Sequence, residues 1–162
     1  MNVVRFQSRG AEKYRFLSNF WLSPFVVDGK TYATNEHFYQ ASKATCDDDH
    51  ELVRNQPGPK DAMIAGRYKI RCREDWERPV TLAAPYTLKE MKMGRGLVAK
   101  FSQNRELREA LLATGDDELV EHSRNDSYWG DPGDGSGSNV LGKMLMRLRE
   151  LFRRHLKCSG GS

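Results

Sequence analysis

The stretch Thr34–Ala44 reads TNEHFYQASKA and predicts a helix with Thr34 as its N-cap. Helical spacing places Glu36, Gln40 and Lys43 at positions i, i+4 and i+7, on one face of that helix. The residues between them are largely apolar, which is typical of a helix packed into a core on most of its circumference. Because a buried charge is costly unless it is paired or used, the polar face predicts one wall of a functional site. The alternative is an ordinary solvent-exposed Glu–Lys face.

Length and composition predict one domain with its own core. The 162 residues are 38% hydrophobic and 30% charged, enough to bury a core without disulfide bonds or metals. We expect a single domain over residues 1–156 and a disordered tail over 157–162. No apolar run approaches the roughly 18 residues that span a bilayer, and the N-terminus lacks the apolar core of a signal peptide. These features argue against a membrane protein and predict a cytoplasmic one.

Cysteine usage argues against cross-links and metal sites. Cys46, Cys72 and Cys158 are odd in number and share no ligand spacing with one another or with histidine. The sequence therefore predicts reduced thiols, no metal and no cofactor.

Positive charge is concentrated near the C-terminus. The net charge is +4 and the pI is about 9.0, which fits an anionic partner. Much of the excess lies in the expected last helix, in Lys143, Arg147, Arg149, Arg153, Arg154 and Lys157. A solvated helix face and a nucleic-acid contact both explain this concentration.

Hydrophobic periodicity and turn residues predict a mainly α fold with a short β-hairpin and minor strands, with an α+β fold as the alternative. The hairpin signal is Asp28-Gly29 between β-formers. In chain order the expected elements are a strand at 3–6, the hairpin at 25–32, helices at 34–44, 49–55, 60–65, 87–104 and 105–114, a strand at 118–122 and a helix at 140–156. Gly66 is expected to end the third helix, whereas Gly94 and Gly96 in the fourth indicate either slack or close helix packing.

Two further segments combine aromatic rings with polar groups. Residues 14–21 hold four aromatics around Ser18 and Asn19, an arrangement that suits a core or the sandwiching of a base or sugar. Residues 66–77 are rich in cations and end near Trp76. This second segment is either a charged loop with an anchoring Trp, or a site in which Arg67, Arg71 or Arg73 holds phosphate while Trp76 stacks on a ring.

A glycine-rich loop at residues 130–139 leads into the last expected helix, with Ser138 or Asn139 as the cap. Backbone N–H groups at such a junction can bind phosphate. Two aspartates in the loop oppose anion binding, and the loop does not have the Gly-Lys-Ser/Thr ending of a Walker A motif.

Taken together, eight ordered motifs resemble the YbiA-like N-glycosidase family, also called NADAR domains, over about residues 16–151. Each motif alone is weak, but eight in order with similar spacing are specific. They are FLSNF at 16–20, DGKTY at 28–32, EHFYQASK at 36–43, GR at 66–67 with DWE at 75–77, AKF at 99–101, LVE at 119–121, NDSYWG at 125–130 and NVLG at 139–142.

The resemblance implies a compact, mainly helical domain that hydrolyses the N-glycosidic bond between a ribose and a nitrogen base. The substrate classes it implies are early phosphorylated riboflavin-biosynthesis intermediates and ADP-ribose attached to guanine in nucleic acid. Glu36 matches the family's essential glutamate. The residues that match its pocket are Lys43, Trp76, Asp126, Trp129 and Asn139. The chain departs from the family pattern at Pro132 and Ser136 and at residues 77–87, where the outer parts of a substrate would bind.

The chemistry agrees with this assignment. Breaking a ribosyl C–N bond develops oxocarbenium character, so a fixed carboxylate such as Glu36 can stabilise the sugar and activate water. Lys43 has three open roles: contact with phosphate, donation to the leaving base, or attack on a ring-opened anomeric carbon to form an imine. Glu36 and Lys43 are thus the expected catalytic residues. The expected substrate-binding residues are Asn19, Phe20, Gln40, Arg67, Trp76, Asp126, Trp129 and Asn139.

Packing or turn-forming roles remain the alternative for the tryptophans and for Asp126. For the whole protein, one alternative is a non-catalytic module that binds ADP-ribose or nucleotides. Another is a nucleic-acid binder that uses the C-terminal basic helix, with affinity that falls steeply with salt. The expected partner is a small nucleotide or an ADP-ribosylated nucleic acid, and the oligomeric state is left open.

Overall fold

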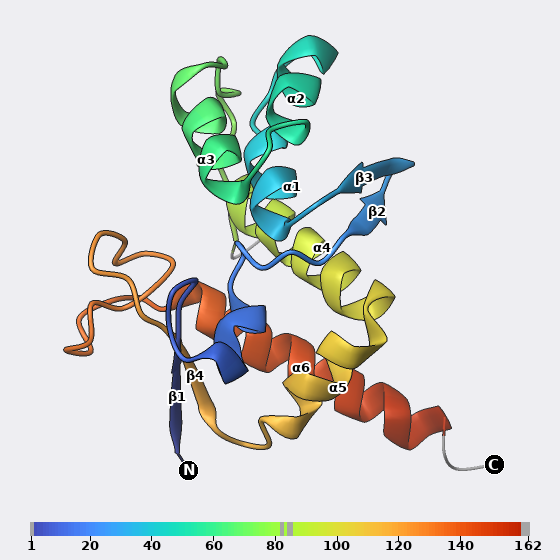
Figure 1. The fold of residues 1–162 in the computed structure, drawn as a ribbon, viewed down its shortest axis with the longest axis vertical. Helices are drawn as coiled ribbons and strands as arrows, with labels where there is room; N and C mark the ends of the chain where they lie inside the picture. Colours follow the sequence, from blue (N-terminus) through green and yellow to red (C-terminus); the bar gives the residue numbers. More distant parts are fainter. Residues whose placement is uncertain (1, 82, 84–85, 160–162) are drawn as a thin grey trace. The chain divides into compact units, whose positions relative to one another are not determined.

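The fold is mainly helical with two small sheets, as the sequence predicts (Figure 1). The computed structural model describes residues 2–81, 83 and 86–159. The chain groups into two compact units: unit 1 comprises residues 1–21 and 105–162, and unit 2 comprises residues 22–104. A single domain over residues 1–156 stays a prediction.

Unit 2 begins with the predicted hairpin. Strand β2 (Phe25–Val27) pairs antiparallel with β3 (Lys30–Tyr32). The two turn residues have positive φ angles, 51° at Asp28 and 75° at Gly29. Asp-Gly is suited to this pair of left-handed conformations, which matches the twist of the strands, and the hairpin prediction is confirmed.

The central element of unit 2 is helix α1 (Asn35–Ala41), all seven residues of which are buried. It packs against α2 (Asp47–Arg54), α3 (Pro59–Tyr68) and α4 (Leu88–Gln103). The predicted cap is confirmed, because the Thr34 hydroxyl accepts the backbone N–H of His37 at 3.3 Å. A helix enclosed on all sides buries its polar residues together with its apolar ones.

Two helix ends in unit 2 differ from the prediction. Helix α1 ends at Ala41 rather than near residue 44, because the backbone N–H groups of Lys43 and Ala44 bond three residues back, to Gln40 and Ala41. Lys43 therefore lies in a tight turn after the helix. Helix α3 continues past Gly66 to Tyr68, so the prediction that Gly66 ends it is wrong.

The glycines of α4 have separate explanations. A Cβ atom at Gly96 would meet the side chains of Asn35 and Phe38, the latter at 2.7 Å. Nothing lies within 4 Å of a Cβ built at Gly94. Close helix packing is thus the correct explanation for Gly96, which lets α4 approach α1.

Unit 1 contains the second sheet. Strand β1 (Val3–Phe6) runs parallel to β4 (Glu118–Glu121), with Val3 opposite Glu118. A 3₁₀ helix, η1 (Glu12–Leu17), packs against β1. Helix α6 (Val140–Ser159) packs against β4 and against α5 (Arg105–Ala113).

The last helix is longer than predicted. It continues to Ser159, so residues 157–159 of the expected disordered tail are helical, and residues 160–162 lie outside the described part. Two of its cations have structural partners: Arg149 donates to the Thr114 hydroxyl at 2.7 Å, and Arg153 pairs with Asp116 at 2.6 Å. Part of the C-terminal charge therefore holds the helix against the loop before β4.

Among the residues that the structure describes, none of the helices has the length and apolar character needed to cross a membrane.

Candidate active site

A buried carboxylate–amide pair lies on α1. Glu36 is 7% exposed and Gln40 is 4% exposed. The side-chain amide of Gln40 donates from Nε2 to Oε1 of Glu36 at 2.7 Å. Because a carboxylate only accepts hydrogen bonds, this contact fixes which end of the amide faces Glu36. The alternative of a solvent-exposed polar face is therefore wrong for these two residues.

The other end of the Gln40 amide faces α3. Its Oε1 is buried and has no hydrogen-bond partner among the described residues. A Cβ at Gly66 would lie 2.8 Å from Cβ of Gln40 and would also clash with Oε1. Gly66 thus makes room for the Gln40 side chain, and with it for the orientation of Glu36.

Lys43 lies one turn beyond this pair, in a partly buried environment. Burial is the main cause of a lowered pKa for its ammonium, with Glu36 raising the pKa and Arg67 lowering it. Its Nζ lies 5.4 Å from the centroid of the Tyr39 ring and 5.9 Å from that of Trp76. The ammonium thus lies near two aromatic rings and close enough to Glu36 for the two charges to interact.

The two rings beside Lys43 pack on each other. The Tyr39 and Trp76 centroids are 5.2 Å apart, at an angle of 54°. Trp76 is only 5% exposed, and its backbone is tied to Arg73 and Lys89. The indole is therefore part of the packed wall of this site, and stacking on a base stays a prediction. Arg67 is exposed in the last turn of α3.

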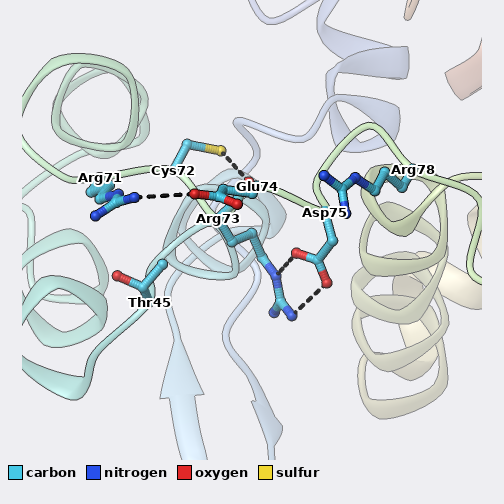
Figure 2. A pocket seen from close by; sticks show the side chains of 7 residues that line it. All are labelled: Thr45, Arg71, Cys72, Arg73, Glu74, Asp75 and Arg78. Carbon is cyan, nitrogen blue, oxygen red and sulfur yellow. Dashed lines mark hydrogen bonds and ion pairs between the residues drawn. The ribbon is translucent and has the colours of Figure 1, made fainter.

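A pocket of about 420 Å³ adjoins this group. Figure 2 shows the side chains that line it. It is lined by Thr45, Arg71, Cys72, Arg73, Glu74, Asp75 and Arg78. The backbone N–H of Arg73 donates to the Lys43 carbonyl at 2.9 Å, which fixes the pocket segment to the turn that carries Lys43. Unit 2 thus brings together Glu36, Gln40, Lys43 and Trp76, with a cation-lined pocket beside them.

The remaining five predicted site residues belong to unit 1. Asn19 is buried and Phe20 is half-buried, in the turn after η1. The Phe20 backbone N–H donates to the Ser18 hydroxyl at 3.2 Å. A binding role for Asn19 and Phe20 stays a prediction.

Asp126 and Trp129 share one turn. The Asp126 carboxylate accepts the backbone N–H groups of Tyr128 and Trp129 at 3.0 and 2.9 Å. This is the turn-capping role that the sequence left as the alternative for Asp126. Trp129 is half-buried and contacts the Tyr128 ring edge-on, with centroids 5.1 Å apart.

The side chain of Asn139 is held by β4. Its Oδ1 accepts from the Glu121 backbone at 3.1 Å, and its Nδ2 donates to the Leu119 carbonyl at 2.9 Å. Asn139 has a φ of 48°, a left-handed conformation that Asn tolerates well. These contacts fix the start of α6.

The glycine-rich loop already contains an anion of its own. The Asp131 carboxylate accepts backbone N–H groups of three glycines: Gly133 at 2.7 Å, Gly135 at 3.3 Å and Gly137 at 2.8 Å. These N–H groups lower the pKa of Asp131. Asp131 thus takes up three of the N–H donors that could have bound a phosphate, in agreement with the expectation that aspartates in the loop oppose anion binding.

Within residues 2–81, 83 and 86–159, no group of three or more His, Cys, Asp or Glu side chains is arranged to hold a metal ion. Sequence reasoning did not assign site roles to Tyr39, Gly66 or Asp131. Helical spacing predicts Tyr39 only as part of the largely apolar surface around the polar face, and local pattern predicts Gly66 only as a helix end. Only their contacts with Trp76 and Gln40 show what they do.

Comparison with known proteins gives the class. The chain is 42% identical to the N-glycosidase YbiA of Escherichia coli over 149 residues, covering 91% of this chain and 87% of that protein. It is 35% identical to an N-glycosidase of Nostoc punctiforme, covering 92% of each. The solution structure of E. coli YbiA matches with a TM-score of 0.80 at 41% identity, over 95% of this chain and 86% of that one. The chain is thus a glycosyl hydrolase in class.

The family follows from a direct match. A family model described as the NADAR domain matches residues 5–153. The chain belongs to the NADAR domain family, and the resemblance that the eight motifs indicate is confirmed. A riboflavin biosynthesis protein of Vibrio vulnificus is also 39% identical over 148 residues, which are 89% of this chain and 37% of that longer protein.

Proposed function

We propose that this protein hydrolyses the N-glycosidic bond between a phosphorylated ribose and a nitrogen base, with Glu36 as the catalytic carboxylate. The observation that carries the proposal is the buried Glu36, held by the 2.7 Å hydrogen bond from Gln40. A carboxylate fixed in this way needs little reorganisation when positive charge develops beside it.

The proposed reaction begins with lengthening of the bond between the anomeric carbon and the base nitrogen. The sugar then acquires oxocarbenium character, which the negative charge of Glu36 stabilises. Glu36 also accepts a proton from the attacking water, whose oxygen bonds to the anomeric carbon. The leaving base takes up a proton, and the products are the free ribose phosphate or ADP-ribose and the base.

Lys43 is proposed to act at the leaving base or at the anomeric carbon. Burial lowers the pKa of its ammonium, which makes the group a better proton donor and increases the fraction of neutral amine. The first property suits donation to the leaving base, and the second suits attack on a ring-opened sugar to form an imine. A lowered pKa does not favour the third role, a fixed cationic contact with phosphate.

The proposed substrates are ADP-ribose linked to guanine in nucleic acid and the early phosphorylated riboflavin-biosynthesis intermediates. Relatives named N-glycosidase support the bond type, and the relative named as a riboflavin biosynthesis protein supports the second substrate class. Arg67 and the Tyr39–Trp76 pair are proposed to contact the substrate around Lys43. A substrate-binding role for the unit 1 residues Asn19, Phe20, Asp126, Trp129 and Asn139 stays a prediction.

The test is mass spectrometry of the products after incubation with guanine-ADP-ribosylated DNA and, separately, with the riboflavin-pathway intermediates. The wild type is compared with Glu36→Gln and with Glu106→Gln, a control at an exposed glutamate of α5. We expect release of ADP-ribose or ribose phosphate by the wild type and the control. Glu36→Gln should lower turnover by about 10² to 10³-fold, the usual cost of losing a fixed group that stabilises transition-state charge.

A non-catalytic ADP-ribose-binding module predicts a different result. In that case neither substrate is cut, ADP-ribose still binds, and Glu36→Gln leaves its affinity almost unchanged. This outcome would overturn the hydrolase proposal for this chain.

A further inference from the structure

The pocket beside Lys43 has an arrangement of charge that points to an anionic ligand. Three of its lining side chains are arginines and two are carboxylates. Arg71 pairs with Glu74 at 3.2 Å, and Arg73 pairs with Asp75 through two hydrogen bonds of 2.6 and 3.0 Å. Arg78 makes no side-chain hydrogen bond or ion pair to a described residue. Arg78 is therefore the one pocket arginine that neither of the two pocket carboxylates pairs with.

Further cations lie close to the same segment. Lys92 on α4 is near enough to Arg73 for the two charges to interact, and its pKa is lowered by burial first and then by Arg95 and Arg73. Arg73 and Arg78 both lower the pKa of Asp75, with the hydrogen bond from Arg73 as the larger cause. The positive charges around Arg73 thus exceed what Asp75 neutralises.

The pocket is joined to the proposed catalytic group through the backbone. Thr45 lies two residues after Lys43, and the Arg73 N–H donates to the Lys43 carbonyl. Trp76, which packs on Tyr39, follows Arg73 by three residues and donates its own N–H to the Arg73 carbonyl at 3.3 Å. A ligand whose reacting carbon lies near Glu36 and Lys43 would extend its other end toward this pocket.

We propose that the pocket of Thr45, Arg71, Arg73 and Arg78 binds the phosphate or diphosphate group carried by the ribose of the substrate. The proposal rests on the proposed function for the identity of that substrate. Arginine is suited to this role because its planar guanidinium presents paired N–H donors that match phosphate oxygens. Asp75 holds the Arg73 guanidinium in place and competes with the ligand for it (Figure 2).

In this assignment Lys43 and the pocket arginines have different roles. Lys43, partly buried and with a lowered pKa, acts at the bond that breaks. The arginines of the pocket, whose planar guanidinium groups match phosphate oxygens, bind the group that does not react. Binding energy from this remote anion would position the sugar for reaction at Glu36.

The experiment measures equilibrium binding of inorganic pyrophosphate and of ADP-ribose by isothermal titration calorimetry at constant ionic strength. The variants are Arg73→Gln and Arg78→Gln, and the matched control is Arg95→Gln. Arg95 is also in unit 2 and also contacts a carboxylate at 2.6 Å, that of Asp28, but it does not line the pocket. We expect about a tenfold or greater loss of affinity for both ligands in the two pocket variants, with the control close to wild type.

Asp75→Asn should change the affinity for pyrophosphate in the opposite direction. Removing the competing carboxylate leaves Arg73 in place and should raise the affinity for pyrophosphate. If Arg73→Gln and Arg78→Gln bind both ligands as the wild type does, the phosphate assignment is overturned. It is also overturned if these variants lose affinity only for a ten-nucleotide thymidine oligomer, because the phosphates recognised would then be those of a nucleic-acid backbone.

Binding and turnover separate this inference from the proposed function. If the pocket variants lose pyrophosphate binding and the wild type cuts neither substrate, the anion site is supported and the hydrolase proposal is rejected. If the wild type turns over a substrate and the variants bind pyrophosphate and ADP-ribose as the wild type does, the hydrolase proposal is supported and the anion site is rejected.

Discussion

Gln40 Nε2 donates a 2.7 Å hydrogen bond to Oε1 of Glu36, one turn earlier on the same buried helix. The sequence placed these two side chains on one face, but burial of that face turns the pair into a fixed anion. In water the same contact would contribute little, because solvent would compete for both groups. Enclosed by α2, α3 and α4, the pair sets the orientation of the proposed catalytic carboxylate.

We expect Gln40→Met to destabilise the protein by about 1.5–3 kcal/mol, because it leaves the buried Glu36 without this donor while keeping the side-chain volume similar. Urea unfolding gives the free energy of unfolding. The control is Gln56→Met, which removes a solvent-exposed 2.8 Å bond to the Leu52 carbonyl and should cost less than about 1 kcal/mol. If the two variants lost equal amounts of unfolding free energy, the Glu36–Gln40 bond would contribute no more to stability than the exposed one.

Two glycine-to-alanine substitutions should change the free energy of unfolding in opposite directions. Gly66→Ala places a methyl group 2.8 Å from Cβ of Gln40 and should cost about 1–3 kcal/mol, as overpacking usually does. Gly94→Ala meets nothing within 4 Å and should gain about 0.5–1 kcal/mol from helix propensity. Thermal and urea unfolding of the two variants measure both effects, and a stabilised Gly66→Ala would contradict the close approach of α3 to α1.

Stability should rise with pH above neutrality because of Lys100. This lysine is fully buried in α4, and burial lowers its pKa to about 7 from 10.5. Between these values the unfolded chain binds more protons than the folded protein, so raising the pH favours folding. Below about pH 7 both states carry the charge, and its burial cost is fully present.

The measurement is the free energy of unfolding from pH 6 to 10 for the wild type, Lys100→Met and the exposed Lys60→Met. Lys100→Met should flatten the rise that the wild type and Lys60→Met show. A wild-type profile without that rise would mean that Lys100 keeps its ordinary protonation in the folded protein.

Lys43 can be tested for covalent chemistry. If its amine attacks the ring-opened sugar, sodium borohydride added during turnover should reduce the imine and leave the ribosyl group attached to the protein. Mass spectrometry of the intact protein and its peptides should place the adduct at residue 43, and Lys43→Arg should show none. Continued turnover without any adduct would exclude the imine and leave Lys43 as the donor to the leaving base.

Activity should survive chelation. Among the described residues no cluster of His, Cys, Asp and Glu is placed to hold a metal, and the proposed chemistry uses Glu36, Lys43 and water. Turnover of the cut substrate is measured before and after EDTA treatment and dialysis. Loss of turnover that a divalent ion restores would require a metal in the mechanism.

The sequence determined the local structure and the family of this protein. The hairpin follows from Asp28-Gly29, because few residue pairs tolerate two positive φ angles in succession. The start of α1 follows from Thr34, because a hydroxyl at that position satisfies an N–H that the helix leaves open. Eight ordered motifs gave the family, since their joint spacing is far more specific than any one of them.

Only the tertiary structure decided which local features serve a site. Helical spacing put Glu36 and Gln40 together but left burial open, because burial depends on elements that pack from elsewhere in the chain. The role of Gly66 depends on where α3 meets Gln40. Whether the N–H groups of the glycine-rich loop are open to a phosphate depends on Asp131, which folds back onto them. Contacts between residues distant in sequence are set by the packing of whole elements, which local pattern does not encode.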